Sequence, residues 1–148
     1  MHQVKNLGHE EAETAIRVIR DKLLKGKKAA VITVVDAHGE LIAMLRLNGA
    51  PLPSILNAQN KAYTAAREGI PSRDLGQAAR DPKDGFDMAY FGDSRYIGWG
   101  GGVPVEIDGQ ILGAVGVSGL PEEEDMDLAK LGVAVITRDH LRAEGKMI

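Results

Sequence analysis

Residues 29–47 read AAVITVVDAHGELIAMLRL, and this stretch decides the fold. The short β-branched run at 29–35 predicts a strand, and the apolar run at 40–47 predicts a second strand that returns beside it. The sequence DAHG at 36–39 predicts a turn between them, because its aspartate can bond the following backbone and its glycine tolerates positive φ. We therefore predict a β-hairpin.

A second hairpin is predicted further along the chain, where VPVEI at 103–107 and QILGAVGV at 110–117 flank an Asp-Gly pair. Asp-Gly is a strong signal for a two-residue hairpin turn. Gly113 and Gly116 are three residues apart in the second strand, so they face opposite sides of it. They predict bends, or a close approach of other backbone, on both faces.

Apolar residues recur at spacings of three and four around these hairpins. They predict helices at 10–25, at 55–68 and from Pro121 towards the C-terminus, with a short further helix at 72–79. The predicted order is α-β-β-α-(α)-β-β-α. Two hairpins with helices between them indicate the α+β class, with a mainly antiparallel sheet flanked by helices.

Three residues are expected to mark helix ends. Ser54 and Ser72 are expected N-caps, because a serine hydroxyl can accept a hydrogen bond from a free N–H of the first turn. Gly26 is expected at the C′ position of the first helix. The segment 80–94 shows no regular pattern and is long for a loop in a compact domain, which is typical of functional loops.

The composition indicates one globular domain over residues 1–148. Hydrophobic residues make up 44% of the chain and charged residues 26%, unlike a disordered protein. The absence of cysteine excludes a disulfide and a thiolate metal site. A net charge of −3 argues against nucleic-acid binding, and no apolar run reaches the ~20 residues of a membrane span. Since the N-terminus lacks an apolar leader, we expect a cytoplasmic protein without nucleic-acid or membrane partners.

The aromatic residues and the glycines crowd into one region. Five of the six aromatic residues lie in 86–99, and ten of the 18 glycines lie in 85–119. Aromatic walls beside an arginine suit a flat anionic ligand, and successive glycines allow N–H groups to converge on an anion. A small core under the loop and a glycine-rich strand bend would explain the same residues. The candidate ligand-binding residues are Phe91, Tyr96, Trp99, Gly100, Gly101, Gly102 and Pro104.

Three charged residues are candidates for catalysis. Lys61 lies near the apolar stripe of the helix predicted at 55–68, where a partly buried lysine often has a functional partner. Arg95 could hold a carboxylate through its two-pronged guanidinium, and Asp93 could move a proton. The alternatives are a lysine whose ammonium reaches water and an arginine that is paired with Asp93 or Asp87 or is solvated.

The four histidines are dispersed, so their spacing predicts no dedicated zinc site. His9 and Glu13 are one helical turn apart and could share a metal ion. The alternative is that His9 is simply an exposed residue in the first turn of its helix. His140 is expected near the end of the terminal helix, where a cation suits the helix dipole.

Several motifs resemble the GlcG/HbpS family, which includes the haem-binding HbpS proteins and the C-terminal domain of PduO-type proteins. The motifs cover nearly the whole chain in the family's order: VVDAHGELIAMLRLNGAP, NKAYTAAREG, GGGVPVEIDGQILGAVGVSG and PEEEDMDLA. The resemblance implies a profilin- or PAS-like fold and a homo-oligomer. It also implies haem bound through a histidine near the first helix, here His9 or the preceding His2, and iron bound by an ExxE pattern, here Glu10 and Glu13.

Two functions remain open from the sequence. The first is binding of a small, planar, anionic ligand, with haem as the implied cofactor. The second is a cofactor-independent enzyme of the isomerase, tautomerase or hydrolase type that acts on an anionic carboxylate intermediate of a catabolic pathway. A structural subunit of an oligomer, in which the glycines serve only packing, is a third possibility.

Overall fold

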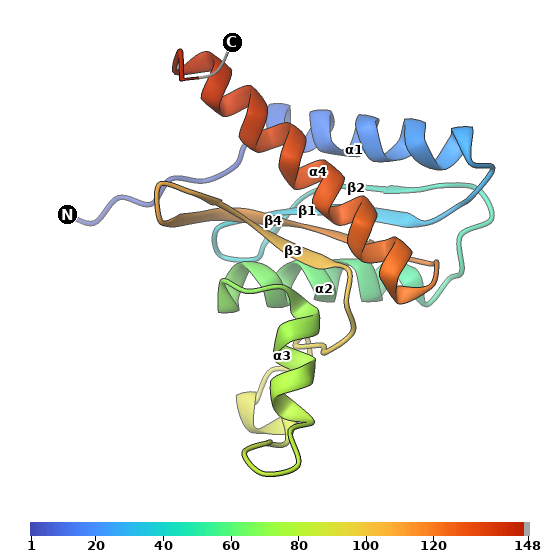
Figure 1. Cartoon of the computed structure of the whole chain (residues 1–148), viewed down its shortest axis with the longest axis vertical. Coiled ribbons are helices and arrows are strands. Elements are labelled where there is room, and N and C mark those ends of the chain that lie inside the picture. Colours follow the sequence, from blue (N-terminus) through green and yellow to red (C-terminus); the bar gives the residue numbers. More distant parts are fainter. Residues whose placement is uncertain (147–148) are drawn as a thin grey trace.

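The computed structural model describes residues 1–146 and contains a four-stranded antiparallel sheet in the order β2-β1-β4-β3 (Figure 1). Both predicted hairpins are confirmed, and β1 pairs with β4 to join them. Strands β2 and β3 form the two edges of the sheet. The strands are β1 (Val31–Asp36), β2 (Leu41–Arg46), β3 (Gly102–Ile107) and β4 (Gln110–Ser118).

Helices cover both faces of this sheet. In Figure 1, α1 and α4 lie on one face, α2 packs against the other, and α3 projects away from the sheet. The predicted class and order are therefore confirmed. None of the helices in residues 1–146 is long and apolar enough to cross a membrane. The helices are α1 (His9–Lys25), α2 (Ser54–Glu68), α3 (Ser72–Ala79), the short 3₁₀ helix η1 (Met88–Phe91) and α4 (Glu122–Ala143).

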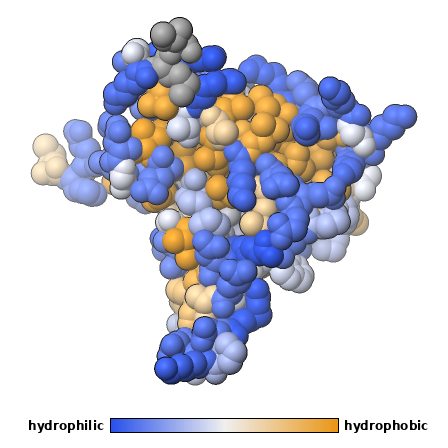
Figure 2. Space-filling model, in the orientation of Figure 1, coloured by the Kyte–Doolittle hydropathy of each residue, from blue (hydrophilic) through white to orange (hydrophobic). Residues whose placement is uncertain are grey.

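The hydrophobic core lies on both sides of β1. This explains why the apolar run at 29–35 is continuous. Ile32 and Val34 belong to the cluster formed with α1 and α4, whereas Val35 packs with the alanines of α2. A strand covered on both faces does not need to alternate polar and apolar residues. Figure 2 shows hydrophobic side chains along the α1–α4 face, with hydrophilic ones at the tip beyond α3.

The two glycines of β4 allow other parts of the chain to approach from opposite sides, as their spacing predicted. A Cβ at Gly113 would lie 2.7 Å from Leu7 Cδ1, and one at Gly116 would lie 2.9 Å from Ala62 Cβ. Both distances are shorter than van der Waals contact. These glycines therefore place α2 and the segment before α1 directly on the sheet.

All three predicted helix ends are wrong in detail. Pro53 and Pro71 occupy the N-cap positions of α2 and α3, and neither helix has a side-chain cap. Ser54 is buried as the first residue of α2, and the Ser72 hydroxyl bonds to the glycine loop instead. At the end of α1, Gly26 keeps a negative φ of −83°, and the left-handed residue is Lys27 at +54°.

Candidate functional site

Lys61 points into the protein interior. Its side chain is only 4% exposed, and its ammonium donates to Asp125 Oδ2 at 3.1 Å and to the Val117 carbonyl at 3.2 Å. The other oxygen of Asp125 accepts the Leu120 N–H at 3.1 Å. Burial raises the pKa of Asp125, and the Lys61 ammonium opposes this shift. This pair ties α2 to the start of α4.

The three consecutive glycines lie against this buried lysine. A Cβ on Gly101 would lie 2.9 Å from Lys61 Cδ, and one on Gly102 would clash with the Lys61 carbonyl. The Gly100 N–H donates to Glu122 Oε1 at 2.6 Å, and the Gly102 N–H donates to Ser72 Oγ at 2.9 Å. These two donors therefore already have acceptors within the protein. Pro104 lies half-buried in the edge strand β3, where a missing N–H is tolerated.

Arg95 and Asp93 meet around a tyrosine of α2. The Tyr63 hydroxyl donates to the Asp93 carboxylate, and Arg95 Nε donates to Asp93 Oδ1 at 3.1 Å. The guanidinium carbons of Arg95 and Arg67 lie 4.0 and 5.0 Å from the centre of the Tyr63 ring. The hydroxyl of Tyr63, followed by Arg95, lowers the pKa of Asp93 to about 2. We call Tyr63, Arg67, Asp93 and Arg95 the Tyr63 cluster.

The structure divides the predicted aromatic wall between two places. Phe91 stacks on Tyr96 with ring centres 4.3 Å apart, and Tyr96 meets Tyr63 edge to face at 5.7 Å. Trp99 is 59% exposed and borders a separate groove of about 350 Å³. That groove also carries Arg80 and Met88. The Phe91–Tyr96 stack therefore belongs with the Tyr63 cluster, and Trp99 does not.

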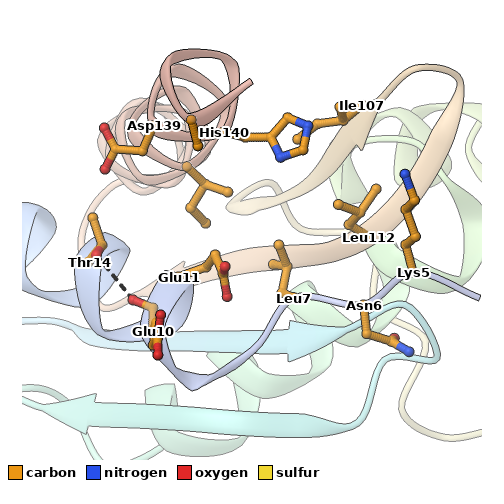
Figure 3. A pocket seen from close by; sticks show the side chains of 12 residues that line it. Lys5, Asn6, Leu7, Glu10, Glu11, Thr14, Ile107, Leu112, Asp139 and His140 are labelled. Atoms are coloured by element: carbon orange, nitrogen blue, oxygen red, sulfur yellow. Dashed lines mark hydrogen bonds between the residues drawn. The ribbon is translucent and has the colours of Figure 1, made fainter. Parts of the chain in front are cut away.

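A larger cavity of about 530 Å³ lies where the start of α1, the end of α4 and the β3–β4 hairpin meet (Figure 3). We call it the end cavity. Its apolar floor is formed by Leu7, Ile107, Leu112 and Ile136. Its polar lining comprises Lys5, Asn6, Glu10, Glu11, Thr14, Asp139 and His140.

The imidazole of His140 projects over this cavity, and Lys5 lies across from it (Figure 3). Two acidic residues of α1 also line the cavity. Glu11 accepts the Gly8 N–H at 2.8 Å, and the backbone carbonyl of Glu10 accepts the Thr14 hydroxyl at 3.0 Å. An apolar floor with one imidazole and one ammonium can hold a flat molecule that carries a metal ion and a carboxylate.

The sequence did not indicate the end cavity, because its lining comes from segments far apart in the chain. His140 could be placed only near a helix end, with nothing to show what it would face. His9 and Glu13 are exposed on α1 and do not line the cavity, although their neighbours Glu10 and Glu11 do. Only the three-dimensional structure shows that His140 lies beside the apolar floor of the cavity.

Comparison with known proteins places the chain in a family. Residues 7–134 match the family model described as haem degrading protein HbpS-like. The chain belongs to this HbpS-like family. It is 34% identical to Protein GlcG of Escherichia coli strain K12 over 119 residues, covering 76% of this chain and 81% of that protein. The GlcG/HbpS resemblance seen in the sequence is therefore confirmed.

Two solved structures extend this result to the fold. Klebsiella pneumoniae protein ORFY is 27% identical, with a TM-score of 0.87 over 93% of this chain and 94% of that one. The crystal structure of a PduOC–haem complex is 25% identical, with a TM-score of 0.81 over 88% of this chain and 94% of that one. His140 lies beyond the residues that match the family model.

Proposed function

We propose that this HbpS-like protein binds a planar tetrapyrrole with carboxylate groups in the end cavity. Haem is the first candidate for this ligand. The observation that carries the proposal is the His140 imidazole over an apolar floor in a cavity of about 530 Å³. Cavities of roughly 300–1,000 Å³ with apolar walls and a few polar groups are typical of small-molecule sites. The haem complex of the structurally similar PduOC supports the same ligand class.

Each part of the cavity has a role in this proposal. The His140 imidazole offers a ring nitrogen to the haem iron, which histidine commonly holds in proteins. Leu7 and Leu112 contact the apolar face of the macrocycle, and Lys5 pairs with a carboxylate at the opposite edge. The acidic Glu10 and Glu11 disfavour a carboxylate on their side. The charges therefore give the ligand one preferred orientation.

A haem titration followed by absorbance tests this proposal. We expect a saturable Soret shift with one haem per chain. Thr14→Trp places an indole in the cavity and is expected to abolish the shift, whereas Arg95→Ala leaves it unchanged. A shift that does not saturate, or one that survives Thr14→Trp at full strength, would contradict the proposal. Native mass spectrometry of the same sample reports the bound mass and tests the homo-oligomer that the resemblance implies.

The Tyr63 cluster favours a second candidate function, a cofactor-independent isomerase, tautomerase or hydrolase acting on an anionic carboxylate. Tyr63 and Arg95 line a small pocket of about 130 Å³ together with Glu40, Gln59 and Asn60. In this function Arg95 orients the substrate carboxylate, and Asp93, which accepts the Tyr63 hydroxyl, takes a proton from one substrate atom and returns it to another through Tyr63.

Keto–enol exchange of phenylpyruvate, followed by ultraviolet absorbance, tests this second function. We expect turnover without added metal or cofactor and a loss of at least about tenfold in kcat/KM for Arg95→Ala. Arg46→Ala changes an exposed arginine on β2 and serves as the matched control. Equal activity in the original protein, Arg95→Ala and Arg46→Ala would exclude the Tyr63 cluster as the site of this reaction.

A further inference from the structure

Three metal-ligating side chains meet beside the end cavity, where the β3–β4 turn reaches the end of α4. They are Asp108, His140 and Glu144, and one ligand atom from each lies within 4.8 Å of the other two. His140 and Glu144 are four residues apart at the end of α4, so they project from the same side of it. Asp108 comes from the tight Asp-Gly turn of the hairpin. Two elements distant in sequence therefore supply one cluster.

Two further observations indicate that this cluster accepts a cation. The Nε2 atom of His140 is buried and lies 3.1 Å from Glu144 Oε1, yet it makes no hydrogen bond of acceptable geometry with any residue in 1–146. The Lys146 ammonium lies 2.7 Å from Glu144 Oε2 and 3.9 Å from Asp108 Oδ2. A positive charge thus already lies between the two carboxylates, beside an imidazole nitrogen without a hydrogen-bond partner.

We propose that Asp108, His140 and Glu144 form a site for a divalent transition metal of the zinc class. One imidazole nitrogen with carboxylate oxygens is a donor set that Zn²⁺ and Co²⁺ accept, with water completing a four-coordinate shell. Ligand atoms about 2.1 Å from a tetrahedral ion lie roughly 3.4 Å apart. The observed separations are 4.8 Å or less, so side-chain rotation is needed to reach this value. The ion replaces the Lys146 ammonium, which moves to solvent.

This metal site is independent of the proposed haem function except for His140. The two ligands compete for that imidazole, so a protein saturated with metal is expected to take up haem more weakly. Asp108 and Glu144 do not line the end cavity. Their substitution therefore separates the two proposals, because it removes metal binding and leaves the haem titration unchanged.

Titration of the tag-free, haem-free protein with Co²⁺ tests the metal site, because four-coordinate Co²⁺ absorbs strongly in the visible range. We expect one equivalent of Co²⁺ to bind per chain and to give the visible spectrum of a four-coordinate ion. Added Zn²⁺ should displace the Co²⁺. Asp108→Asn and Glu144→Gln should each weaken Co²⁺ binding roughly tenfold or more. Lys146→Met should tighten it, since it removes the competing charge.

His9 and Glu13 provide the matched control, because they are also a histidine and a glutamate four residues apart on a helix. His9→Ala and Glu13→Gln should leave Co²⁺ binding unchanged. Absence of saturable Co²⁺ binding would overturn the proposal. The proposal would also be overturned if Co²⁺ binding survived both Asp108→Asn and Glu144→Gln but was lost in His9→Ala and Glu13→Gln. That result would place the metal site on α1.

Discussion

At the scale of single residues, Asp93 is the side chain whose chemistry the fold changes most clearly. It accepts hydrogen bonds from the Tyr63 hydroxyl and from both the side chain and the backbone N–H of Arg95. These donors favour the carboxylate, so the pKa of Asp93 falls from 3.8 to about 2. A lowered pKa adds stability above pH 3.8, and this contribution is lost as the pH falls through about 2.

The Tyr63 hydroxyl makes the largest contribution to this shift, so Tyr63→Phe should raise the pKa of Asp93 towards 3.8. An NMR titration of the Asp93 carboxyl carbon measures the change directly. Acid unfolding of the variant should begin at a higher pH than in the original protein. Tyr90→Phe, at a tyrosine that is 83% exposed, is the control and should leave the pKa unchanged. A pKa of Asp93 that stays near 2 in Tyr63→Phe would contradict this assignment.

The sequence indicated only part of this cluster. The sequence left Arg95 paired with Asp93, paired with Asp87 or solvated. Arg95 pairs with Asp93, whereas Asp87 accepts the Ala89 N–H at the start of η1. Tyr63 gave no local signal, because it lies among the small residues of α2 and its partners Asp93 and Arg95 are about 30 residues further along the chain. Contacts across such distances depend on how α2 and the loop pack together.

At the scale of the elements, the Lys61–Asp125 pair joins α2 to α4 at the end of β4. Both side chains are at least 96% buried, and their polar atoms bond each other, the Val117 carbonyl and the Leu120 N–H. A buried ion pair adds little net stability when intact, but removing one partner leaves a charge without compensation. The pair therefore fixes how the two helices meet.

Lys61→Met should destabilise the protein by about 3 kcal/mol, because it leaves the Asp125 carboxylate buried without its cation. The free energy of unfolding in urea measures the loss. Arg20→Met is the matched control, since Arg20 pairs with Asp21 at 2.8 Å on the exposed side of α1. It should change the free energy by no more than about 0.5 kcal/mol. Equal losses in the two variants would show that burial of the pair has no consequence.

The elements themselves could be predicted because their signals are local. The Asp-Gly pair specifies the β3–β4 turn, and the apolar periodicity placed α1 and α2 within a residue of their observed bounds. Helix capping was mispredicted because it depends on tertiary contacts. The Ser72 hydroxyl is used by the Gly102 N–H and the Trp99 carbonyl, which no local pattern reveals.

At the scale of the whole molecule, the end cavity is assembled from three segments, residues 5–14, 107–112 and 136–143. The sheet order brings them together, because the β3–β4 turn and the start of α1 lie at the same end of the sheet as the end of α4 (Figure 1). The family and the fold could be inferred from the sequence. The cavity could not, since none of its three segments carries a binding motif by itself.

One comparison tests whether His140 offers its imidazole to haem from the end cavity. The Soret band of the haem-loaded protein is recorded for the original chain, for His140→Ala and for His9→Ala. We predict that His140→Ala shifts or abolishes the band, that added free imidazole restores it, and that His9→Ala leaves it in place. A band that is unaffected by His140→Ala and is lost in His9→Ala would contradict this prediction and assign the haem to the start of α1.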